Sequence, residues 1–432
     1  MSIVYCLLPI AYCLLPIVGR PHLSLQLMSE SLSHQQLIDI ANEFGTPVYV
    51  YHAEKIKEQY EKLVAAFSIV DTRIFYACKA LTNINILKYI NSLGCGIDCS
   101  SVTEVKLALH AGVAPEKILY TSNGISFEEI EETVNYGVHV NIDSLSNLEK
   151  FGKKFGNSYP VGVRIRPNIL AGGNLKISTG HEKSKFGIPV DQLDALTSIV
   201  DKYKLRIQAL HIHTGSDIKD ADVFVHGIKV LSELVPHFLD LNIIDLGGGF
   251  KVPYEPGDEE TDINLIARKL KSYLDAHLFI NGKKYQLWFE PGKYLVSECG
   301  YLITRVNVVK DNGHQVFVGV NSGLNHLIRP MMYDAYHHIV NVSNQAGQEK
   351  SYSVTGYICE TDTFASDRLL HEVSEGDYFV FYNAGAYGFE MSSNYNSRYK
   401  PAEVLVKDGK NYLVRRADRF EDLLRNQVEL NF

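Results

Sequence analysis

Eight short apolar runs, most of them separated by helical patterns, limit the architectures open to this chain. Each run has the β-branched and aromatic content of a buried strand; together they occupy residues 74–77, 96–99, 118–121, 139–142, 161–165, 209–213, 243–246 and 287–289. Eight strands alternating with helices over roughly 220 residues are typical of a closed (β/α)8 barrel of the TIM type. An open doubly wound sheet is disfavoured, because its dinucleotide fingerprint GxGxxG is absent.

Beyond the eighth run the pattern changes to short alternating strands, predicted at residues 301–309, 316–320, 352–354, 378–382, 403–406 and 412–416. Such strands indicate a C-terminal antiparallel β-sandwich or small β-barrel. We therefore place the barrel at residues 52–297 and a β domain at residues 298–432. The absence of a linker between them predicts that they pack tightly. Residues 28–51 form an N-terminal segment, whose strand at 47–51 is expected to join the β domain.

The first 27 residues have a different character, because YCLLPI at residues 5–10 recurs unchanged at residues 12–17. They lack the cationic start and small-residue cleavage site of a secretory signal. Prolines also interrupt the run of about 20 apolar residues that a membrane span needs. We expect residues 1–27 to be a non-native or disordered leader, with Met28 as the true start.

The charge and cysteine content indicate which ligands and compartment suit the chain. A net charge of −8 and an isoelectric point near 6.1 argue against nucleic acid or an anionic membrane as partner. Small-molecule ligands are therefore expected. The 7 cysteines are an odd number without zinc-site spacing, which fits a reducing compartment. We predict a cytoplasmic protein that binds no metal.

Lys79 ends the first predicted barrel strand, directly after the apolar residues FYAC. A lysine there has two interpretations: its stem packs on apolar surface with the ammonium in water, or its amine forms a Schiff base with a carbonyl compound. Active sites of such barrels lie at the carboxyl ends of the strands. Asp98, Asp143 and Arg166 are predicted at the same end of the barrel, which favours a site there.

His211 and His213 are two residues apart on the predicted sixth strand, so both side chains point to the same face. A metal pair is disfavoured, because no acidic or cysteine ligand lies nearby at metal spacing. Packed, hydrogen-bonded histidine is the common alternative. A ring lying flat against a cofactor is the third, above all for His213 at the end of the strand.

Two further features suggest which cofactor would suit Lys79. Gly247, Gly248 and Gly249 follow the seventh strand, where consecutive backbone N–H groups can converge on a phosphate, although a plain glycine turn is the alternative. Glu290 closes the eighth strand, where a buried carboxylate needs a cation such as a protonated pyridine nitrogen. An amine, a phosphate turn and a pyridinium partner together describe a site for pyridoxal 5′-phosphate (PLP).

Motifs along nearly the whole chain after about residue 35 resemble the diaminopimelate decarboxylase family. They are YACKA (76–80), DCSSVTE (98–104), KFGI (185–188), HIHTGS (211–216), GGGF (247–250), EPGK (290–293), CETD (359–362), AGAYG (384–388) and MSSNYNSR (391–398). So many motifs in one order make the resemblance specific.

The resemblance implies a fold-type III, PLP-dependent carboxy-lyase acting in the last step of lysine biosynthesis. It would remove one carboxylate from meso-2,6-diaminopimelate at its D-configured carbon and leave L-lysine. Lys79 would hold the cofactor covalently, His213 would stack on its ring, and Glu290 would pair with the ring nitrogen. The phosphate would be held by Ser216, Gly247, Gly248, Gly249 and Tyr387.

The resemblance also implies how the substrate is held and protonated. Its far end would be bound by Arg329, Tyr333 and Glu360, close to Tyr387. Cys359 would return a proton after CO2 leaves. In this family the Cys-Glu loop completes the active site of a second subunit, which implies an obligate homodimer.

Three positions depart from the family pattern. Lys293 stands where the family usually has arginine, which keeps the charge but loses the bidentate fork, so its contact with the phosphate or the substrate carboxylate should differ in geometry. Thr361 replaces a common serine, and Tyr399-Lys400 replaces a usual Pro-Arg. We interpret all three as variation within the family.

Ornithine, arginine and carboxynorspermidine decarboxylases share this barrel and cofactor and are the nearest alternatives. Arg329 together with Glu360 suits a distal centre that carries both a carboxylate and an ammonium group, whereas an enzyme that forms a diamine needs no such arginine. Alanine racemase shares the fold type, but the Cys359-Glu360 pair is unlike it. A non-catalytic PLP-binding homologue would be expected to lack Lys79 or Cys359, and both are present.

Overall fold

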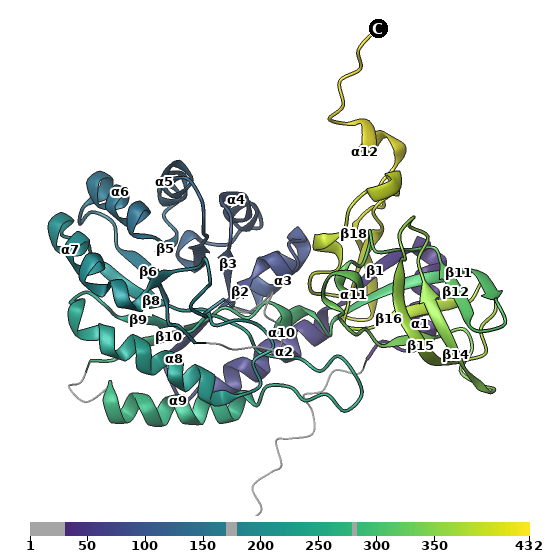
Figure 1. The fold of residues 1–432 in the computed structure, drawn as a ribbon, viewed down its shortest axis with the longest axis horizontal. Helices are drawn as coiled ribbons and strands as arrows, with labels where there is room; N and C mark the ends of the chain where they lie inside the picture. Colours follow the sequence, from purple (N-terminus) through teal and green to yellow (C-terminus); the bar gives the residue numbers. More distant parts are fainter. Residues whose placement is uncertain (1–30, 170–178, 279–282) are drawn as a thin grey trace, which may run out of the picture.

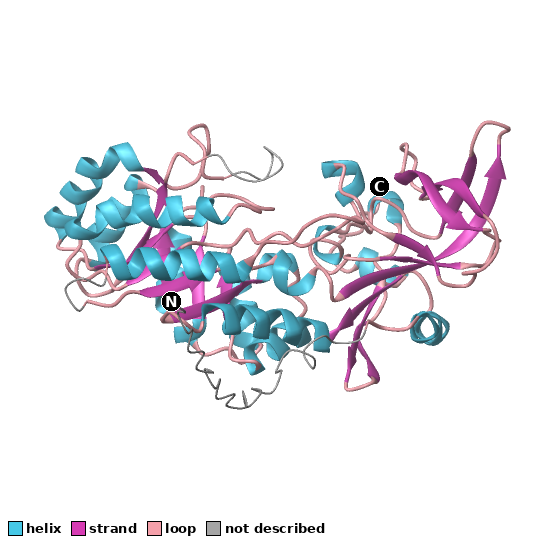
Figure 2. Ribbon diagram, turned by 90° about the horizontal axis from the view of Figure 1, so that it is seen from below, coloured by secondary structure: helices cyan, strands magenta, loops and turns pink. Residues whose placement is uncertain are grey.

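A computed structural model describes residues 31–169, 179–278 and 283–432. The predicted leader at residues 1–27 lies outside the described residues. Figure 1 shows two neighbouring units, a barrel of strands ringed by helices and a domain built mainly of strands. Colouring by secondary structure separates the helix-rich unit from the strand-rich one (Figure 2).

The first unit is a closed barrel of eight parallel strands, as predicted. In chain order its strands are β2 Thr72–Ala77, β3 Gly96–Cys99, β4 Ile118–Thr121, β5 His139–Ile142, β6 Val161–Arg166, β8 Ile207–His211, β9 Ile243–Asp245 and β10 Gln286–Phe289. Pairing of β5 with β6 and of β2 with β10 closes the ring. A two-residue strand, β7 Ile188–Pro189, pairs beside β6. The predicted sixth strand ends earlier than expected, at His211, so His213 lies in the following loop.

Eight helices form the outer layer of the barrel: α2 Ala53–Phe67, α3 Ile84–Ser92, α4 Val102–His110, α5 Phe127–Asn135, α6 Leu145–Phe155, α7 Leu193–Tyr203, α8 Ala221–Leu234 and α9 Ile263–His277. In α2, Ile56, Leu63 and Phe67 are buried and recur at helical spacing. The ring of Phe67 lies 4.3 Å from that of Phe289 on β10. Apolar stripes of this kind hold the helices on the strands.

The interior of the barrel is apolar at one end and charged at the other. Near the amino ends of the strands, a separate cluster of buried side chains fills the barrel: Phe75, Leu119, Ala209, Ile243 and Trp288. Further along the strands the buried side chains are polar: Asp98, Arg164, His211 and Asp245. Because a packed apolar layer closes one end, ligands can enter only at the carboxyl ends.

The second unit is a mixed sheet made of β1 Val48–His52, β11 Gly300–Asp311, β12 Val316–Val320, β13 Ile339–Asn341, β14 Glu349–Thr355, β15 Thr363–His371, β16 Tyr378–Phe381, β17 Ala402–Lys407 and β18 Lys410–Arg415. Most neighbours are antiparallel, as predicted, but β1 pairs with β17, and β12 with β14, in parallel. Only a direct hairpin forces antiparallel pairing, and long connections separate the strands of these two pairs.

The remaining helices are α1 His34–Phe44, α10 Lys293–Val296, α11 Arg329–Tyr333 and α12 Phe420–Leu424. Ser33 caps α1 by accepting a hydrogen bond from the N–H of Gln36. Helix α12 lies on an arm that projects from the β domain in Figure 1. Among the described residues, every helix is too short or too polar to cross a membrane.

Hydrogen bonds join the two units around the end of β2. The backbone N–H of Tyr387, in the β domain, donates to the carbonyl of Ala80 at 2.9 Å. Thr82 donates through its N–H and its hydroxyl to Glu390. Glu403 of β17 accepts hydrogen bonds from Tyr51 and from Asn83, which follows the same turn. The β domain therefore fixes the segment that carries Lys79.

The Glu403 side chain makes a pH-dependent contribution to stability. Burial raises the pKa of Glu403 to about 7, above that of an unfolded glutamate. The folded state therefore binds a proton more tightly, and the stabilisation that this gives is lost as the pH rises through about 7. Glu403→Gln cannot ionise, so wild type should lose up to ~3 kcal/mol more free energy of unfolding than the variant between pH 5 and pH 8. Urea midpoints at both pH values measure the difference; parallel pH curves would contradict it.

Candidate active site

Lys79 is the central residue of a single turn, Cys78–Ala80, that follows β2. Its side chain remains accessible, while surrounding protein atoms desolvate it strongly. A group at the bottom of an open cavity has both properties. The register of β2 and β3 sets Ala77 opposite Asp98, so the Asp98 carboxyl and the Lys79 amine share the mouth of the barrel.

Neighbouring charges decide the state of Lys79 in the protein alone. Burial lowers the pKa of its amine. Asp98, Tyr387 and Glu290 together raise that pKa by more than burial lowers it, so the net pKa is raised. The side chain is therefore an ammonium ion before any ligand binds. It must give up a proton before it can act as a nucleophile.

The Gly247–Gly249 turn has no room for side chains. A Cβ atom on Gly248 would lie 2.2 Å from the carbonyl oxygen of Glu290, and one on Gly249 would lie 2.5 Å from that of Gly215. Gly247 also has φ +67°, a left-handed conformation that favours glycine. The loops after β8, β9 and β10 therefore meet backbone to backbone, which a plain surface turn would not require.

Two of the three glycine N–H groups already have acceptors. Gly247 donates to Oδ1 of Asp245 at 2.9 Å, and Gly248 donates to Nδ1 of His213 at 3.2 Å. Only the Gly249 N–H has no acceptor among the described residues. The turn therefore offers an anion one free donor rather than three.

The bond from Gly248 also defines the protonation of His213. Burial lowers the pKa of His213 well below its usual value, and Lys79 and Arg164 lower it further, so the ring is neutral. Because Nδ1 accepts the Gly248 N–H, the ring proton resides on Nε2. His213 is thus a neutral, oriented ring at the carboxyl end of the barrel, as the flat-ring interpretation requires.

Glu290 immediately follows β10 at the carboxyl end of the barrel, and its buried carboxylate has an oxygen that can still accept a hydrogen bond. Its Oε2 is 3.3 Å from Nε2 of His211, while its Oε1 has no partner among the described residues. Burial raises the pKa of Glu290, but His211, His213 and Lys79 together lower it to about 2. An ionised, partly unpaired carboxylate in this position fits a cationic ring nitrogen, so the site fits PLP.

Lys293 and Ser216 lie on the same side of the site as the glycine turn. Ser216 is half-buried, next to Gly215. Lys293 is buried and forms an ion pair with Asp217, Nζ to Oδ1 at 2.5 Å. The lysine predicted to face the phosphate or the substrate thus has a carboxylate of its own in the protein alone.

Arg329 and Tyr387 bring the β domain to the site. The Arg329 guanidinium is buried, lies 4.7 Å from the ring centre of Tyr254, and is 3.2 Å from Nε2 of His337. Burial and then Arg329 lower the pKa of His337 to about 3, so its Nε2 accepts from the arginine. Burial raises the pKa of the Tyr387 hydroxyl, while the charges of Lys79 and Arg329 both lower it, so all three groups belong to the same site. Tyr333 is half-buried at the end of α11.

Cys359 and Glu360 are exposed on the surface of the β domain. Asn396 donates to Sγ of Cys359 at 3.0 Å, and the Tyr395 hydroxyl donates to Oε1 of Glu360 at 2.5 Å. Among the described hydrogen bonds and ion pairs, none joins this loop to a barrel residue. The single chain therefore assembles Lys79, His213, Glu290 and Arg329 but leaves the predicted proton donor outside.

Two residues with a part in this geometry were absent from the predicted site. Arg164 and Asp245 are buried in the barrel interior and influence the pKa values of the groups around Glu290. Asp245 carried a readable signal, since a carboxylate inside the apolar run IIDL needs a partner. Arg164 and Arg166 are two residues apart on β6 and therefore share a face, but the prediction included only Arg166, at the end of the strand, whereas the structure buries Arg164.

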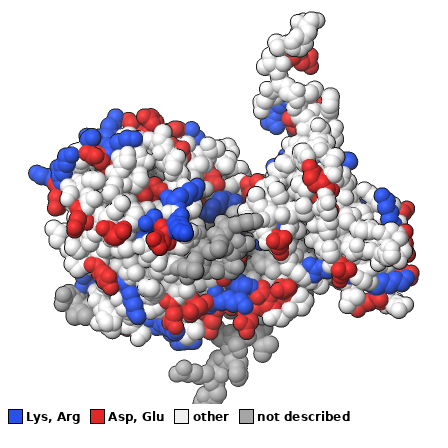
Figure 3. All heavy atoms as spheres, in the orientation of Figure 1, with Lys and Arg blue, Asp and Glu red and all other residues white. Residues whose placement is uncertain are grey.

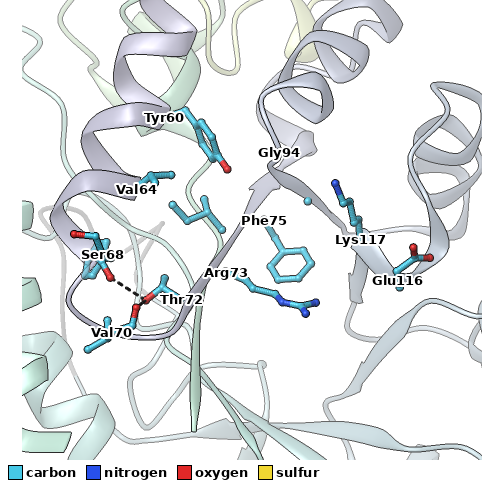
Figure 4. A pocket seen from close by; sticks show the side chains of 13 residues that line it. Tyr60, Val64, Ser68, Val70, Thr72, Arg73, Phe75, Gly94, Glu116 and Lys117 are labelled. Atoms are coloured by element: carbon cyan, nitrogen blue, oxygen red, sulfur yellow. Dashed lines mark hydrogen bonds between the residues drawn. The ribbon is translucent and has the colours of Figure 1, made fainter. Parts of the chain in front are cut away.

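Cavities also lie outside this cluster in the described residues. One of about 440 Å³ opens where β2 and β3 begin, at the opposite end of the barrel from Lys79, and includes Phe75, Arg73 and Lys117 (Figure 4). Another, of about 460 Å³, is lined by Asp143 and Lys185 near the carboxyl ends of β5 and β6. On the face in Figure 3 acidic and basic side chains are interspersed.

Comparison with known proteins identifies the family. Residues 53–297 match the family model described as the pyridoxal binding domain of pyridoxal-dependent decarboxylases. The chain is 38% identical to diaminopimelate decarboxylase of Methanothermobacter thermautotrophicus over 90% of this chain and 93% of that protein. The chain belongs to the diaminopimelate decarboxylase family. Members of this family are carboxy-lyases that use PLP, in agreement with the cofactor predicted from the sequence.

Two further similarities support the assignment to this family. The diaminopimelate decarboxylase of Aquifex aeolicus is 35% identical over 91% of this chain and 94% of its own length. The crystal structure of diaminopimelate decarboxylase from Helicobacter pylori complexed with L-lysine has a TM-score of 0.83 and 32% identity, covering 90% of this chain and 98% of that one. Both units of the fold therefore lie within the similarity.

Gly248→Ala tests the close packing of the glycine turn. The added methyl group meets the Glu290 carbonyl oxygen at 2.2 Å, so the variant should lose about 2–4 kcal/mol of stability and bind PLP more weakly. Gly257→Ala is the matched control, because Gly257 has φ +82° with no atom within 4 Å and should cost only about 1–2 kcal/mol. Urea unfolding and absorbance titration with PLP measure both effects. Equal losses in the two variants would show that the turn tolerates a side chain.

Proposed function

We propose that this protein decarboxylates meso-2,6-diaminopimelate to L-lysine and CO2 with PLP as cofactor. The observation that carries the proposal is the position of Arg329. Its buried guanidinium and the Lys79 amine both act on the Tyr387 hydroxyl, so the arginine and the lysine belong to one site. A substrate attached near Lys79 would therefore direct its distal end toward an arginine, and arginine binds carboxylates in a bidentate manner.

The residues of the barrel mouth would each have a defined part in this reaction. Bound PLP supplies an electron sink for the pair left behind when CO2 departs. Lys79 would hold the cofactor, and Glu290 would keep its ring nitrogen protonated. The neutral ring of His213 would lie against the ring face. Within the part of the chain that the structure describes, the Gly249 N–H and the Ser216 hydroxyl make no hydrogen bond, and these groups next to the turn would meet the phosphate.

Substrate selection separates this function from the related decarboxylases. Ornithine and arginine carry no second carboxylate, so binding them would leave the buried Arg329 guanidinium without an anion, which is costly. Tyr333 lies at the end of α11, the helix that Arg329 begins. Glu360 would bind the ammonium group beside the distal carboxylate, provided that its loop reaches a site.

We propose that this loop reaches the site of a second copy and that the enzyme is a homodimer. The support is the exposure of Cys359 and Glu360 together with that of Tyr395, whose hydroxyl binds Glu360. Met331 and Met332 on α11 are also exposed, next to Arg329. A second chain that covers these side chains would bring the Cys359 thiol to the reacting carbon as proton donor.

Two broader expectations accompany this proposal. The thiols of Cys78, Cys95, Cys99, Cys299 and Cys359 are free in the described residues, which supports a cytoplasmic location. We also propose the division into residues 28–51, 52–297 and 298–432 as structural units, with the first contributing β1 to the last. The pairing of β1 with β11 and β17 supports the assignment of the first segment to the β domain.

Substrate selectivity provides the first test. Holoenzyme offered meso-diaminopimelate, ornithine, arginine or carboxynorspermidine separately should release CO2 only from the first and form L-lysine, measured by gas release and chromatography. Lys79→Ala should lose turnover and the visible absorbance of bound cofactor. Lys117→Ala, which changes an exposed lysine at the opposite end of the barrel, should retain both. Decarboxylation of ornithine alone would refute the substrate.

Mixing two inactive variants tests the shared site. Cys359→Ala should bind PLP and turn over about 10²–10⁴-fold more slowly, because it lacks the proton donor. In a mixed dimer with Lys79→Ala, one of the two sites receives both functional residues. Random exchange should therefore restore about a quarter of wild-type activity. Absence of recovery, with exchange verified by differently tagged subunits, would place Cys359 in its own chain's site or outside catalysis.

A further inference from the structure

Three buried side chains meet at the carboxyl end of the barrel, below the position assigned to the cofactor ring. His211 ends β8, Asp245 ends β9 and Glu290 follows β10. One nitrogen or oxygen atom from each lies within 4.8 Å of those of the other two. Glu290 already has an assigned part in the reaction, but His211 and Asp245 do not.

The acceptors in this group outnumber its donors. Oδ1 of Asp245 accepts the Gly247 N–H, whereas Oδ2 of Asp245 and Oε1 of Glu290 are both buried without a hydrogen-bond partner among the described residues. The two ring nitrogens of His211 also make no hydrogen bond there, although Nε2 lies 3.3 Å from Oε2 of Glu290. A carboxylate oxygen of Asp245 lies within 4.8 Å of one of Glu290, and this proximity raises the pKa of Asp245. Two ionised carboxylates can only accept, so this contact becomes favourable only when one proton lies between them.

The surrounding charges decide which carboxyl group carries that proton. Burial, Glu290 and Asp98 raise the pKa of Asp245, whereas the Gly247 N–H and, more weakly, the Arg164 guanidinium lower it, so the net pKa is raised. Glu290 instead faces His211, His213 and Lys79, which favour its ionised form. Asp98 is offset by Lys79 and Arg164. Of the three carboxyl groups, Asp245 has the weakest support from cations, because the Arg164 guanidinium that acts on it is shared with Glu290 and Asp98, which it affects more strongly.

We propose that Asp245 remains protonated and acts, together with His211, as a positioning residue that donates hydrogen bonds to Glu290 and keeps it ionised toward the ring nitrogen of the cofactor. His211 would donate through Nε2–H and Asp245 through its carboxyl O–H. This inference rests on the proposed function for the cofactor but not on the identity of the substrate. Neither residue would touch the substrate.

The arrangement explains why an acid and an imidazole occur where two more apolar residues would pack. A buried carboxylate without donors would either take up a proton or turn away from its partner. Two fixed donors remove both alternatives, because they satisfy lone pairs of Glu290 and leave others for a pyridinium N–H. The donors must themselves be neutral, since an ionised Asp245 would repel Glu290.

Matched substitutions distinguish donation from mere packing. Asp245→Asn and His211→Gln keep an N–H donor of similar reach, whereas Asp245→Leu and His211→Leu fill the space without one. Apoprotein titrated with PLP should bind it within about threefold of wild type in the two amide variants and about 10–100-fold more weakly in the two leucine variants. The visible spectrum of the bound cofactor should change with pH only in the leucine variants, because their Glu290 no longer holds the ring nitrogen protonated.

A second readout needs no cofactor. If Asp245 holds a proton in the folded state, wild-type apoprotein loses stability as the pH rises above about 4, and Asp245→Asn, which cannot ionise, loses less. The charged or titratable groups that act on Asp245 or lie beside it are Glu290, Asp98, Arg164 and His211, and all are retained in that variant. Unfolding midpoints between pH 5 and pH 8 measure the difference, even if the leucine variants fail to fold.

Several outcomes would overturn the proposal. Equal PLP affinity in all four variants would exclude any role in cofactor binding, and equal weakening by Asp245→Asn and Asp245→Leu would show that Asp245 acts as an anion. Identical pH dependence of wild-type and Asp245→Asn apoprotein would show that no proton resides there. Because these measurements use no substrate, they stand apart from the diaminopimelate assay, which can fail independently.

Discussion

The structure depends on the burial of opposed charges at one end of a parallel barrel. Water is excluded from the strands, so each charged group there must find its partner among side chains fixed to neighbouring strands. Asp98 and Glu290 face Lys79 and Arg164 across the barrel mouth. The apolar layer beneath these groups strengthens the attraction between their opposite charges, because it limits screening by solvent.

The β domain supplies the other wall of the site. Its 384–390 loop binds the turn that carries Lys79 through the Tyr387 N–H and through Glu390. Arg329 enters from the same side. Neither unit alone therefore contains a site that could hold both ends of a dicarboxylic amino acid. Strand β1 precedes the barrel in sequence but pairs with β11 and β17 of the β domain, which follows the barrel. The chain therefore passes from the β domain to the barrel and back, which links the two units.

Much of the barrel could be predicted from sequence because its strands are short apolar runs whose ends coincide with polar residues. The pairing of side chains was harder to predict, because it depends on which loops meet when the barrel of strands closes. The Lys293–Asp217 pair joins loops after different strands, and Arg164, which shares a face of β6 with Arg166, is buried because it lies deeper in the strand. Strand β15 was missed because Asp367, with φ +52°, interrupts its alternation. The resemblance to a known family supplied roles for Cys359 and Arg329 that spacing alone did not.

The hydrogen bond from the Gly248 N–H to Nδ1 of His213 has a consequence for how such a site can diverge. The residue that would face the ring and the turn that would hold the phosphate share one bond, so they form a single mechanical unit. A change that shifts the turn also rotates the imidazole and removes the contact that defines its tautomer. Substitution at Gly248 is therefore constrained by His213, and the reverse. A related protein with a different turn at the proposed phosphate site would also need a different residue in place of His213.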